Sequence, residues 1–510
     1  MKNALGAKKD IALLALLLFA GLAIAALFYS GPFYSYDDMN YINFAFQAMH
    51  GSFYIGESPY AYGFAFPYFI AVSFWLLGYG ALQGTFPSIF SYLAMIAVTY
   101  MAAKSFKGTF VAALAAMLTL TAPFLIQYST RIMPDPVLGL FAGLSVLLAL
   151  LAGSSRHEKT LYALSGVLAG FTVFIKLEAL AFVLFFFIGI LFLSLDGYNT
   201  KHRRRDGNAI IALLTLLAVL YAYFVCVYAM TGSAFYTVER YGAFQHSISP
   251  VTFNDNVENL IITLLAFNTN GIFKPYALSP IIYPYGLGLV FAMMASGIGI
   301  MERNRKIAFL SIVAWGFFLY MYFGTMSLSH YIFIAVITRY FSMIAVPVSI
   351  LGALGIASFY DMIKEYCKNC AIVATMLIIA LVALVGIPTY LTIYSYNKAI
   401  ALDNSAIKCA TGYLQGNSIA QTYTNAAPGM IGLYSSYKVH AYTIGNNCNS
   451  TYFNSTLLFF YGNKSALKGL DSWLGSHCNA EHVYTCNESI NGNTYNSTIH
   501  EVNILRIYPK

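Results

Sequence analysis

The fold is decided by the opening stretch of the chain, where an apolar run, Ile11-ALLALLLFAGLAIAAL-Phe28, is followed by an acidic and aromatic one, Tyr34-SYDDMN-Tyr41. The apolar run is close to the ~20 residues that an α-helix needs to cross a bilayer. Asp37 and Asp38 stand side by side just beyond it, in a chain of which only 9% is charged. Adjacent carboxylates at the end of a membrane helix are costly to hold away from water. They indicate either a functional site or the N-cap of a following helix.

Composition gives the broad class of the protein. Of its 510 residues 59% are hydrophobic, and the mean hydropathy is +0.66. Apolar runs of spanning length recur and predict an all-α polytopic membrane protein with eleven transmembrane helices. The spans are expected at roughly 11–29, 85–103, 109–128, 134–152, 161–175, 178–195, 208–230, 281–301, 306–324, 341–360 and 371–394. The stretch 62–80 is also apolar, but Pro67 interrupts it, so we expect a helix lying at the outer face.

The distribution of Lys and Arg supports this topology. Sixteen of the 28 fall in segments placed on the inner side, and seven lie in the tail. The outer face of the membrane domain keeps five: Arg131, Lys176, Arg240, Lys274 and Arg339. Such a bias is what the positive-inside rule predicts, with the amino terminus cytoplasmic. The net charge of +8 is mostly this bias and gives no indication of nucleic-acid binding.

Two domains are expected. Residues 1–395 form the membrane domain, with large outer loops at 30–84 and 231–280. Residues 396–510 are polar, with strand-like runs at 419–423, 439–442 and 504–508, which favours a small α/β domain. This tail is expected on the extracytoplasmic side, because it carries five Asn-X-Ser/Thr sequons and four cysteines, which suit an oxidising compartment. The sequons are at Asn449, Asn454, Asn463, Asn487 and Asn496, and the cysteines are Cys409, Cys448, Cys478 and Cys486.

The tail cysteines allow two interpretations. Disulfide bonds are favoured by the compartment. The spacing Cys478-x3-His482-x3-Cys486 also allows a zinc site. The sequons, together with dense use of Tyr, Ile and Asn, favour the cell membrane of an archaeon over the endoplasmic reticulum.

The ionisable groups of the outer face indicate a chemistry. They are Asp37, Asp38, Glu57, Arg131, Asp135, Lys176, Glu178, Arg240, Lys274 and Arg339. A carboxylate can take the proton of an acceptor, while Arg and Lys can bind a phosphate and stabilise the charge it gains on leaving. This set suits transfer from an anionic, membrane-embedded donor to a neutral acceptor. A glycosidase would normally need two carboxyl groups, whereas one base and a direct displacement predict inversion at the anomeric carbon.

The chain resembles the GT-C superfamily of glycosyltransferases, which includes protein O-mannosyltransferases, lipid A aminoarabinose transferases and the RgtA/B/C/D-like group. The matching features, in order along residues 1–395, are Asp37-Asp38 with Tyr41, Pro67, Arg131 with Asp135, Gly166-x3-Gly170 with Lys176, and Arg339-Tyr340 before Pro347. Asp replaces the usual Glu at position 38.

The resemblance implies roles for these residues. It makes Asp37 the catalytic base and lets Asp38 orient the acceptor or hold a divalent metal. Arg131, Lys176 and Arg339 would bind the polyprenyl-phosphate head group. The wider set of acceptor or loop candidates contains Glu57, Asp135, Tyr340 and Lys274.

The sequence therefore predicts an integral-membrane glycosyltransferase that takes a hexose-type sugar from a polyprenyl (dolichyl) phosphate donor. The acceptor is a protein, lipid or glycan on the extracytoplasmic face. The alternative is a polytopic transporter or lipid-linked sugar flippase. Few charges within the spans and no broken helix pair at mid-membrane speak against that alternative.

Overall fold

The computed structural model describes residues 2–29, 31, 36–56, 58–153, 155–194, 203–248, 257, 260, 288–325, 331, 338–366, 376, 390, 414–415 and five strands between 421 and 509. Glu57, Lys274 and most of the predicted last span, 371–394, lie outside these residues. So do the sequons at Asn449, Asn454, Asn463 and Asn496. Asn487 lies at the end of a strand whose side chains are not described.

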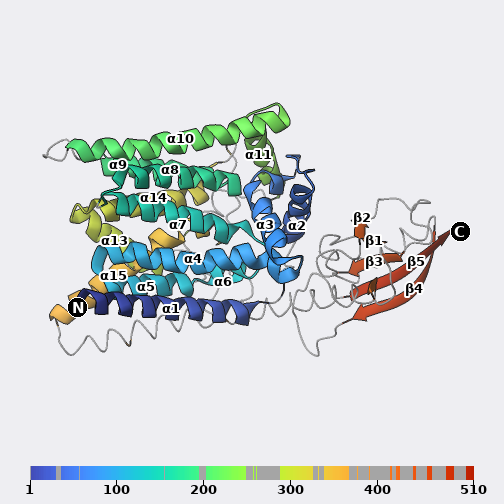
Figure 1. Cartoon of the computed structure of the whole chain (residues 1–510), viewed down its shortest axis with the longest axis horizontal. Helices are drawn as coiled ribbons and strands as arrows, with labels where there is room; N and C mark the ends of the chain where they lie inside the picture. The colour runs from blue at the N-terminus through green and yellow to red at the C-terminus, as the bar shows by residue number, and fades with distance from the viewer. Residues whose placement is uncertain are drawn as a thin grey trace.

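The described part of residues 1–395 is a helical bundle (Figure 1). Its long helices run along one common direction, and shorter helices cover one end. The helices are α1 (Lys2–Phe28), α2 (Tyr36–Met49), α3 (Ala65–Leu77), α4 (Ala81–Lys107), α5 (Thr109–Leu120), α6 (Pro123–Ser129), α7 (Pro134–Ala152), α8 (Glu158–Ile175), α9 (Ala179–Ser194), α10 (Arg203–Thr231), α11 (Tyr236–Ile248), α13 (Gly288–Met301), α14 (Arg305–Phe323) and α15 (Ala345–Tyr366), with the 3₁₀ helices η1 (Pro59–Ala61) and η3 (Thr338–Ile344).

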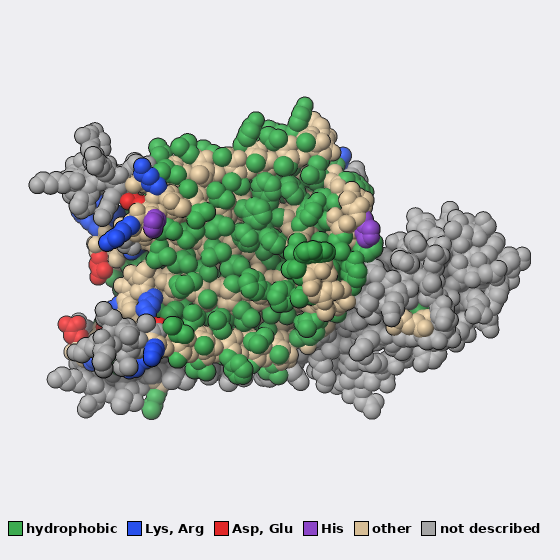
Figure 2. All heavy atoms as spheres, in the orientation of Figure 1, with side chains coloured by type: hydrophobic (Ala, Val, Ile, Leu, Met, Phe, Trp, Pro, Cys, Tyr) green, Lys and Arg blue, Asp and Glu red, His purple; other side chains and the backbone are tan. Residues whose placement is uncertain are grey.

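Within the described residues, seven helices are long and apolar enough to cross a membrane, or eight if the bent pair α5–α6 counts as one span. Figure 2 shows hydrophobic side chains covering the middle of the bundle. Large apolar side chains such as Phe19, 70% exposed, face outward there. This outer surface is what a helical protein presents to lipid tails, so the chain is an integral membrane protein.

The predicted spans at 178–195 and 281–301 are described only as shorter apolar helices, α9 and α13. The predicted span 109–128 is not one straight helix: α5 and α6 meet at an angle of 57°. The expectation that the spans contain no broken helix pair is therefore wrong for this segment. The bend has a local cause, because Pro123 begins α6 and has no N–H to continue the hydrogen bonds of α5. The hydroxyl of Tyr92, on α4, bonds the freed carbonyl of Leu120 at 2.6 Å.

The segment 62–80 forms α3, as expected for a helix at one face. Its 13 residues give a length of only about 20 Å, short of the ~30 Å hydrocarbon core. In Figure 1 α3 lies with α2 and α11 at one end of the bundle. The end of α4 that carries Lys104 and Lys107 lies at the opposite end, where Figure 2 shows Lys and Arg side chains gathered.

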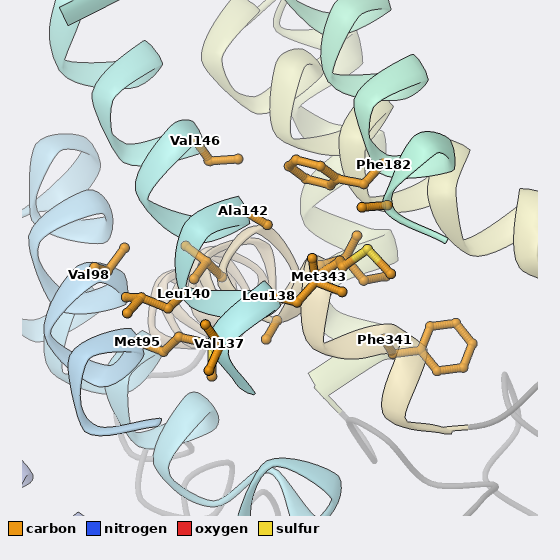
Figure 3. Close-up of a cluster of buried hydrophobic side chains, with 14 of the residues drawn as sticks. Met95, Val98, Val137, Leu138, Leu140, Ala142, Val146, Phe182, Phe341 and Met343 are labelled. Atoms are coloured by element: carbon orange, nitrogen blue, oxygen red, sulfur yellow. The ribbon is translucent and has the colours of Figure 1, made fainter. Parts of the chain in front are cut away.

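The centre of the bundle is an apolar core between α4, α7, α9 and the η3–α15 segment. Figure 3 shows Met95 and Val98 of α4 facing Val137, Leu140 and neighbouring residues of α7. Phe341 and Met343 of η3 join the same core, and both are fully buried. Because η3 is packed into this core, the polar residues at its start are fixed relative to α7.

Close helix contacts at glycines tighten the bundle, as the predicted Gly166-x3-Gly170 pattern required. A Cβ atom at Gly166 would lie 2.0 Å from the carbonyl oxygen of Ala212 on α10. A Cβ atom at Gly170 would lie 2.8 Å from the Cβ of Val219. Small residues therefore let α8 approach the α10 backbone.

The tail contains a five-stranded sheet in the order β2-β1-β3-β5-β4. The strands are β1 (Gln421–Thr424), β2 (His440–Thr443), β3 (Thr456–Tyr461), β4 (Cys478–Asn487) and β5 (Glu501–Pro509). Strand β1 is parallel to β2 and β3, whereas β5 is antiparallel to β3 and β4. The three predicted strand-like runs coincide with β1, β2 and β5.

Strand β4 contradicts the zinc interpretation of the tail. Cys478, His482 and Cys486 all lie on this one extended strand. At about 3.4 Å per residue, neighbouring members of the set are about 13 Å apart, too far for ligands of one zinc ion. For the same reason Cys478 and Cys486 cannot bond to each other, because bridged Cα atoms lie within about 7 Å. A disulfide from either would need another partner.

Candidate active site

Asp37 and Asp38 lie in the first turn of α2, where a helix dipole favours negative charge. The two side chains differ in position. Asp38 is fully buried, while Asp37 is only partly buried and lines a cavity of about 260 Å³. The described residues around this cavity are Asp37, Tyr41, Pro59, Tyr60, Gly63, Ile175, Lys176, Leu177, Glu178, Tyr241, Phe244, Arg339 and Tyr340.

Both oxygens of the Asp37 carboxylate accept a hydrogen bond. The Tyr60 hydroxyl donates to Oδ1 at 2.6 Å, and Nη1 of Arg339 donates to Oδ2 at 2.5 Å. Burial works against ionisation of Asp37, but the charge of Arg339, the two hydrogen bonds and the charge of Lys176 outweigh it. The pKa of Asp37 is therefore below its ordinary value, and the group is a carboxylate at neutral pH.

Arg339 is positioned by the packing of η3 on α7. A Cβ atom at Gly139 of α7 would lie 2.7 Å from the carbonyl oxygen of Ser342, so glycine permits this close approach. The Ser342 hydroxyl in turn donates to the Arg339 carbonyl at 2.8 Å. Nη1 of Arg339 also lies 3.7 Å from Sδ of Met133, in the loop that precedes α7.

Lys176 follows the end of α8 and is buried among carboxylates. Its Nζ donates to Oδ1 of Asp135 at 2.9 Å and lies 3.5 Å from Oε1 of Glu178. It also lies 4.5 Å from the centre of the Tyr340 ring. Burial alone would lower the pKa of Lys176, but the two carboxylates raise it above its ordinary value, so the ammonium group keeps its charge.

Glu178 provides a second carboxylate in the same cavity. Its Oε1 accepts a hydrogen bond of 2.7 Å from the Tyr241 hydroxyl, which α11 brings to the site. Burial, followed by the charge of Glu178, raises the pKa of Tyr241 well above its ordinary value, so the hydroxyl keeps its proton. The cavity therefore contains two similar groups, in each of which a tyrosine and a cation contact one carboxylate: Tyr60–Asp37–Arg339 and Tyr241–Glu178–Lys176.

The two groups are joined through Gly63. A Cβ atom at this position would lie 2.1 Å from the carbonyl oxygen of Ile175 and 2.9 Å from Cα of Lys176. The segment that follows Tyr60 is thus packed directly against the backbone that carries Lys176. Any larger residue at Gly63 would force the two sides of the cavity apart.

The predicted site residues fall into three sets. Asp37, Lys176, Arg339 and Tyr340 line the cavity. Asp38, Arg131 and Asp135 are fully buried and are not among the described lining residues, although Asp135 contacts Lys176. Glu57 and Lys274 lie outside the described residues. Roles for all of them in donor or acceptor binding stay predictions.

A divalent metal near Asp38 was one expectation from the resemblance. Among the described residues, no group of three or more His, Cys, Asp and Glu side chains is placed to hold a metal ion. The carboxylates that line the cavity are instead in contact with cations of the chain itself. The described residues of the site therefore do not fit the expected divalent metal.

Sequence reasoning assigned no role to Tyr60, Glu178, Tyr241 or Phe244, although all four line the cavity. Glu178 was recognised only as one of the charges of the outer face. Tyr60 and Tyr241 lie in the two large outer loops, which are rich in aromatic residues, so no local pattern separated them from their neighbours.

Comparison with known proteins agrees with this architecture. A family model described as dolichyl-phosphate-mannose-protein mannosyltransferase matches residues 61–227. That range includes Arg131, Asp135, Lys176 and Glu178. Comparison with the curated proteins gives no match.

Solved structures match over nearly the whole chain. ArnT from Cupriavidus metallidurans, in a crystal structure bound to undecaprenyl phosphate, has a TM-score of 0.62 and 11% identity, with 96% of this chain and 97% of that chain covered. The archaeal oligosaccharyltransferase AglB from Archaeoglobus fulgidus, in complex with an inhibitory peptide and a dolichol-phosphate, has a TM-score of 0.54 and 12% identity. The match covers 93% of this chain and 69% of that chain. At such identities the likeness shows the fold. The chain therefore shares the fold of these membrane transferases, and its residues 61–227 match the dolichyl-phosphate-mannose-protein mannosyltransferase family model.

Proposed function

We propose that this protein transfers a single sugar from a polyprenyl-phosphate-linked donor to a hydroxyl acceptor on the extracytoplasmic face of a membrane, with inversion at the anomeric carbon. The observation that carries the proposal is the ion pair of Asp37 and Arg339 at a cavity. The cavity is lined by residues of α2, η1, α11, the start of η3 and the turn that follows α8. In Figure 1 α2 and α11 lie at the end of the bundle opposite the one where Figure 2 shows Lys and Arg side chains.

Two further observations support the donor class. Structures of the same fold bind undecaprenyl phosphate in one case and a dolichol-phosphate in another. The description of the matched family model names a dolichyl-phosphate-linked sugar. Among the described residues Arg339 and Lys176 are the cations that line the cavity, and they are the groups that would bind a lipid phosphate there.

The reaction that fits these groups is a single displacement. The acceptor oxygen attacks the anomeric carbon and gives its proton to Asp37. The bond between the anomeric carbon and the phosphate oxygen breaks, and its electron pair stays with the phosphate. Arg339 and Lys176 stabilise the charge that the phosphate gains. Attack from the face opposite the leaving phosphate inverts the anomeric centre.

The size of the cavity favours one sugar ring over an oligosaccharide. About 260 Å³ lies just below the ~300–1,000 Å³ of ordinary small-molecule sites. Residues 30–84 and 231–280 and the tail are expected on the same extracytoplasmic side, where the acceptor would arrive. We assign this side from the Lys and Arg bias and propose an archaeal cell membrane from the sequons.

The test is mass spectrometry of glycans and glycolipids from cells with and without the gene, followed by reconstitution of the purified chain in liposomes with radiolabelled dolichyl-phosphate-mannose. We expect one glycan or glycolipid to lose a single sugar residue in the cells that lack the gene. A transporter or flippase would move the labelled lipid between leaflets without forming a new glycosidic bond, and that result would refute the proposal.

A further inference from the structure

The two oxygens of Asp37 are held by groups of different kinds. Arg339, which binds Oδ2, is a cation that a donor phosphate would attract. Tyr60, which binds Oδ1, is neutral, and burial and the charge of Asp37 raise its pKa, so it keeps its proton. A negatively charged donor therefore competes with Asp37 for Arg339 but not for Tyr60.

Tyr60 is fixed by contacts that do not involve Arg339. Its ring meets the Tyr41 ring edge-on, with centroids 5.6 Å apart and an interplanar angle of 86°. Tyr41 in turn packs edge-on against Phe66, with centroids 5.0 Å apart. Pro59 begins η1 and restricts the backbone just before Tyr60. The hydroxyl can thus keep its place beside Oδ1 when Arg339 moves.

We propose that Tyr60 is the positioning residue of Asp37: it holds Oδ1 and so leaves Oδ2 as the oxygen that receives the acceptor's proton. This inference rests on the proposed function of Asp37 as the base. In the donor-free site Arg339 occupies Oδ2. When the donor phosphate binds the guanidinium, Arg339 no longer donates to Oδ2, which can then accept from the acceptor hydroxyl, while the hydrogen bond from Tyr60 keeps Oδ1 in place.

The proton balance follows from this arrangement. The acceptor O–H proton passes to Oδ2 as the new bond to the anomeric carbon forms, and the leaving phosphate takes the electron pair of the broken bond. Asp37 ends the step as a neutral carboxylic acid, which releases its proton to water once the product leaves. Tyr60 neither gains nor loses a proton.

The charged groups that face Asp37 come from several elements. Among the described residues these include Arg339 at the start of η3 and Lys176 after α8, together with the Tyr60 hydroxyl from η1. The hydrogen bond from Tyr60 favours the charged form of the carboxylate. Removal of the Tyr60 hydroxyl should therefore raise the pKa of Asp37. Removal of the Tyr241 hydroxyl, which bonds Glu178, should leave the pKa of Asp37 unchanged.

Tyr241 supplies a matched control for Tyr60. It donates to a carboxylate in the same cavity, but that carboxylate is Glu178. Tyr241→Phe and Tyr60→Phe each remove one phenolic oxygen and keep the ring. The Tyr60→Phe variant retains the edge-on packing with Tyr41, so we expect it to fold, as checked by thermal unfolding in detergent.

The experiment is an infrared titration of the Asp37 carboxyl band in the full chain labelled with ¹³C-aspartate and held in lipid nanodiscs. The band is identified by difference against the same protein with Asp37→Asn. We expect Tyr60→Phe to move the midpoint to higher pH and Tyr241→Phe to leave it unchanged. If Tyr60→Phe loses its unfolding transition, 3-fluorotyrosine at position 60, a stronger donor, should move the midpoint to lower pH. Equal midpoints in the wild type and the Tyr60 variants would overturn the inference.

A rate measurement separates this inference from the proposed function. With dolichyl-phosphate-mannose and a threonine-rich peptide as probes, Tyr60→Phe should lower kcat about 10- to 100-fold, as for a lost hydrogen bond to a charged group. KM for the donor should change less than about twofold, because Tyr60 does not contact the phosphate in this account. Undiminished transfer by Asp37→Asn would refute the role of Asp37 as the base. In that case a shifted Asp37 titration midpoint in Tyr60→Phe would still show that Tyr60 bonds the Asp37 carboxylate.

Discussion

Arg339 and Asp37 are separated by 302 positions in the sequence, yet Nη1 of one lies 2.5 Å from Oδ2 of the other. This pair connects the start of η3 to the first turn of α2 and thereby closes one side of the cavity. Both side chains keep only a small exposed fraction, 16% and 15%. Substituting one member of an ion pair with so little exposure lowers the stability of the fold, because the remaining charge loses its partner.

The pair predicts a non-additive effect on stability. Arg339→Gln should destabilise the protein by about 3 kcal/mol, because it removes the guanidinium that pairs with the partly buried Asp37 carboxylate. The double variant Asp37→Asn, Arg339→Gln should recover part of that loss. Thermal unfolding of the four proteins in one detergent measures the coupling. Strictly additive changes would show that the pair contributes nothing beyond its separate members.

Lys176 should be important for stability as well as for the donor. Lys176→Met removes the ammonium group that contacts the buried carboxylates of Asp135 and Glu178, and we expect a loss of about 3–5 kcal/mol. Lys107→Met is the matched control, because its partner Asp361 lies 2.7 Å away at an exposed position. That change should cost at most about 1 kcal/mol. Similar unfolding temperatures for the two variants would contradict the buried network.

The α8–α10 contact predicts an effect of one methyl group. Gly166→Ala places a Cβ atom 2.0 Å from the Ala212 carbonyl oxygen, so the two helices must separate. We expect a clear fall in unfolding temperature. Gly297→Ala, on the exposed face of α13 with no atom within 4 Å of its Cβ, should be neutral or stabilising by up to about 1 kcal/mol. A neutral Gly166→Ala would mean that the contact is looser than described.

The lowered pKa of Asp37 predicts a pH dependence of stability. Its stabilising effect should be fully present above the ordinary aspartate value of about 3.9 and be lost as the pH falls through the lower folded-state value. The difference in stability between the wild type and Asp37→Asn should therefore stay constant from pH 7 to about 5 and then narrow. Thermal unfolding of the wild type and Asp37→Asn at a series of pH values measures this difference. A difference that widens on acidification would require a raised pKa.

The sequence predicted the parts of this protein that depend on local physics. Apolar runs located the long helices, and the glycines of residues 166–170 indicated a close helix contact, because both patterns report the immediate environment of a segment. The adjacent acids at 37 and 38 predicted a polar site at a helix start. Pro123 could have revealed the bend between α5 and α6, but the uninterrupted apolar composition concealed it.

The parts that sequence reasoning missed depend on pairings between distant segments. Nothing near Tyr60 shows that its hydroxyl reaches Asp37, and nothing near Tyr241 shows that α11 brings it to Glu178. Lys176 was predicted to bind the donor phosphate, and nothing in the sequence around it shows that it also pairs with Asp135, 41 positions earlier. Which of two adjacent acids faces the cavity also follows only from helix packing, which leaves Asp37 partly accessible and buries Asp38.

The most direct test of the central claim is the rate of sugar transfer by purified Asp37→Asn protein from a polyprenyl-phosphate sugar, compared with the wild type and with Asp361→Asn as a control for an acidic residue at the basic end. Thermal unfolding confirms that each protein is folded. We predict that Asp37→Asn lowers transfer by at least about 100-fold, the lower end of what a positioned base contributes, while Asp361→Asn transfers at the wild-type rate. A folded Asp37→Asn protein that transfers as fast as the wild type would contradict the account.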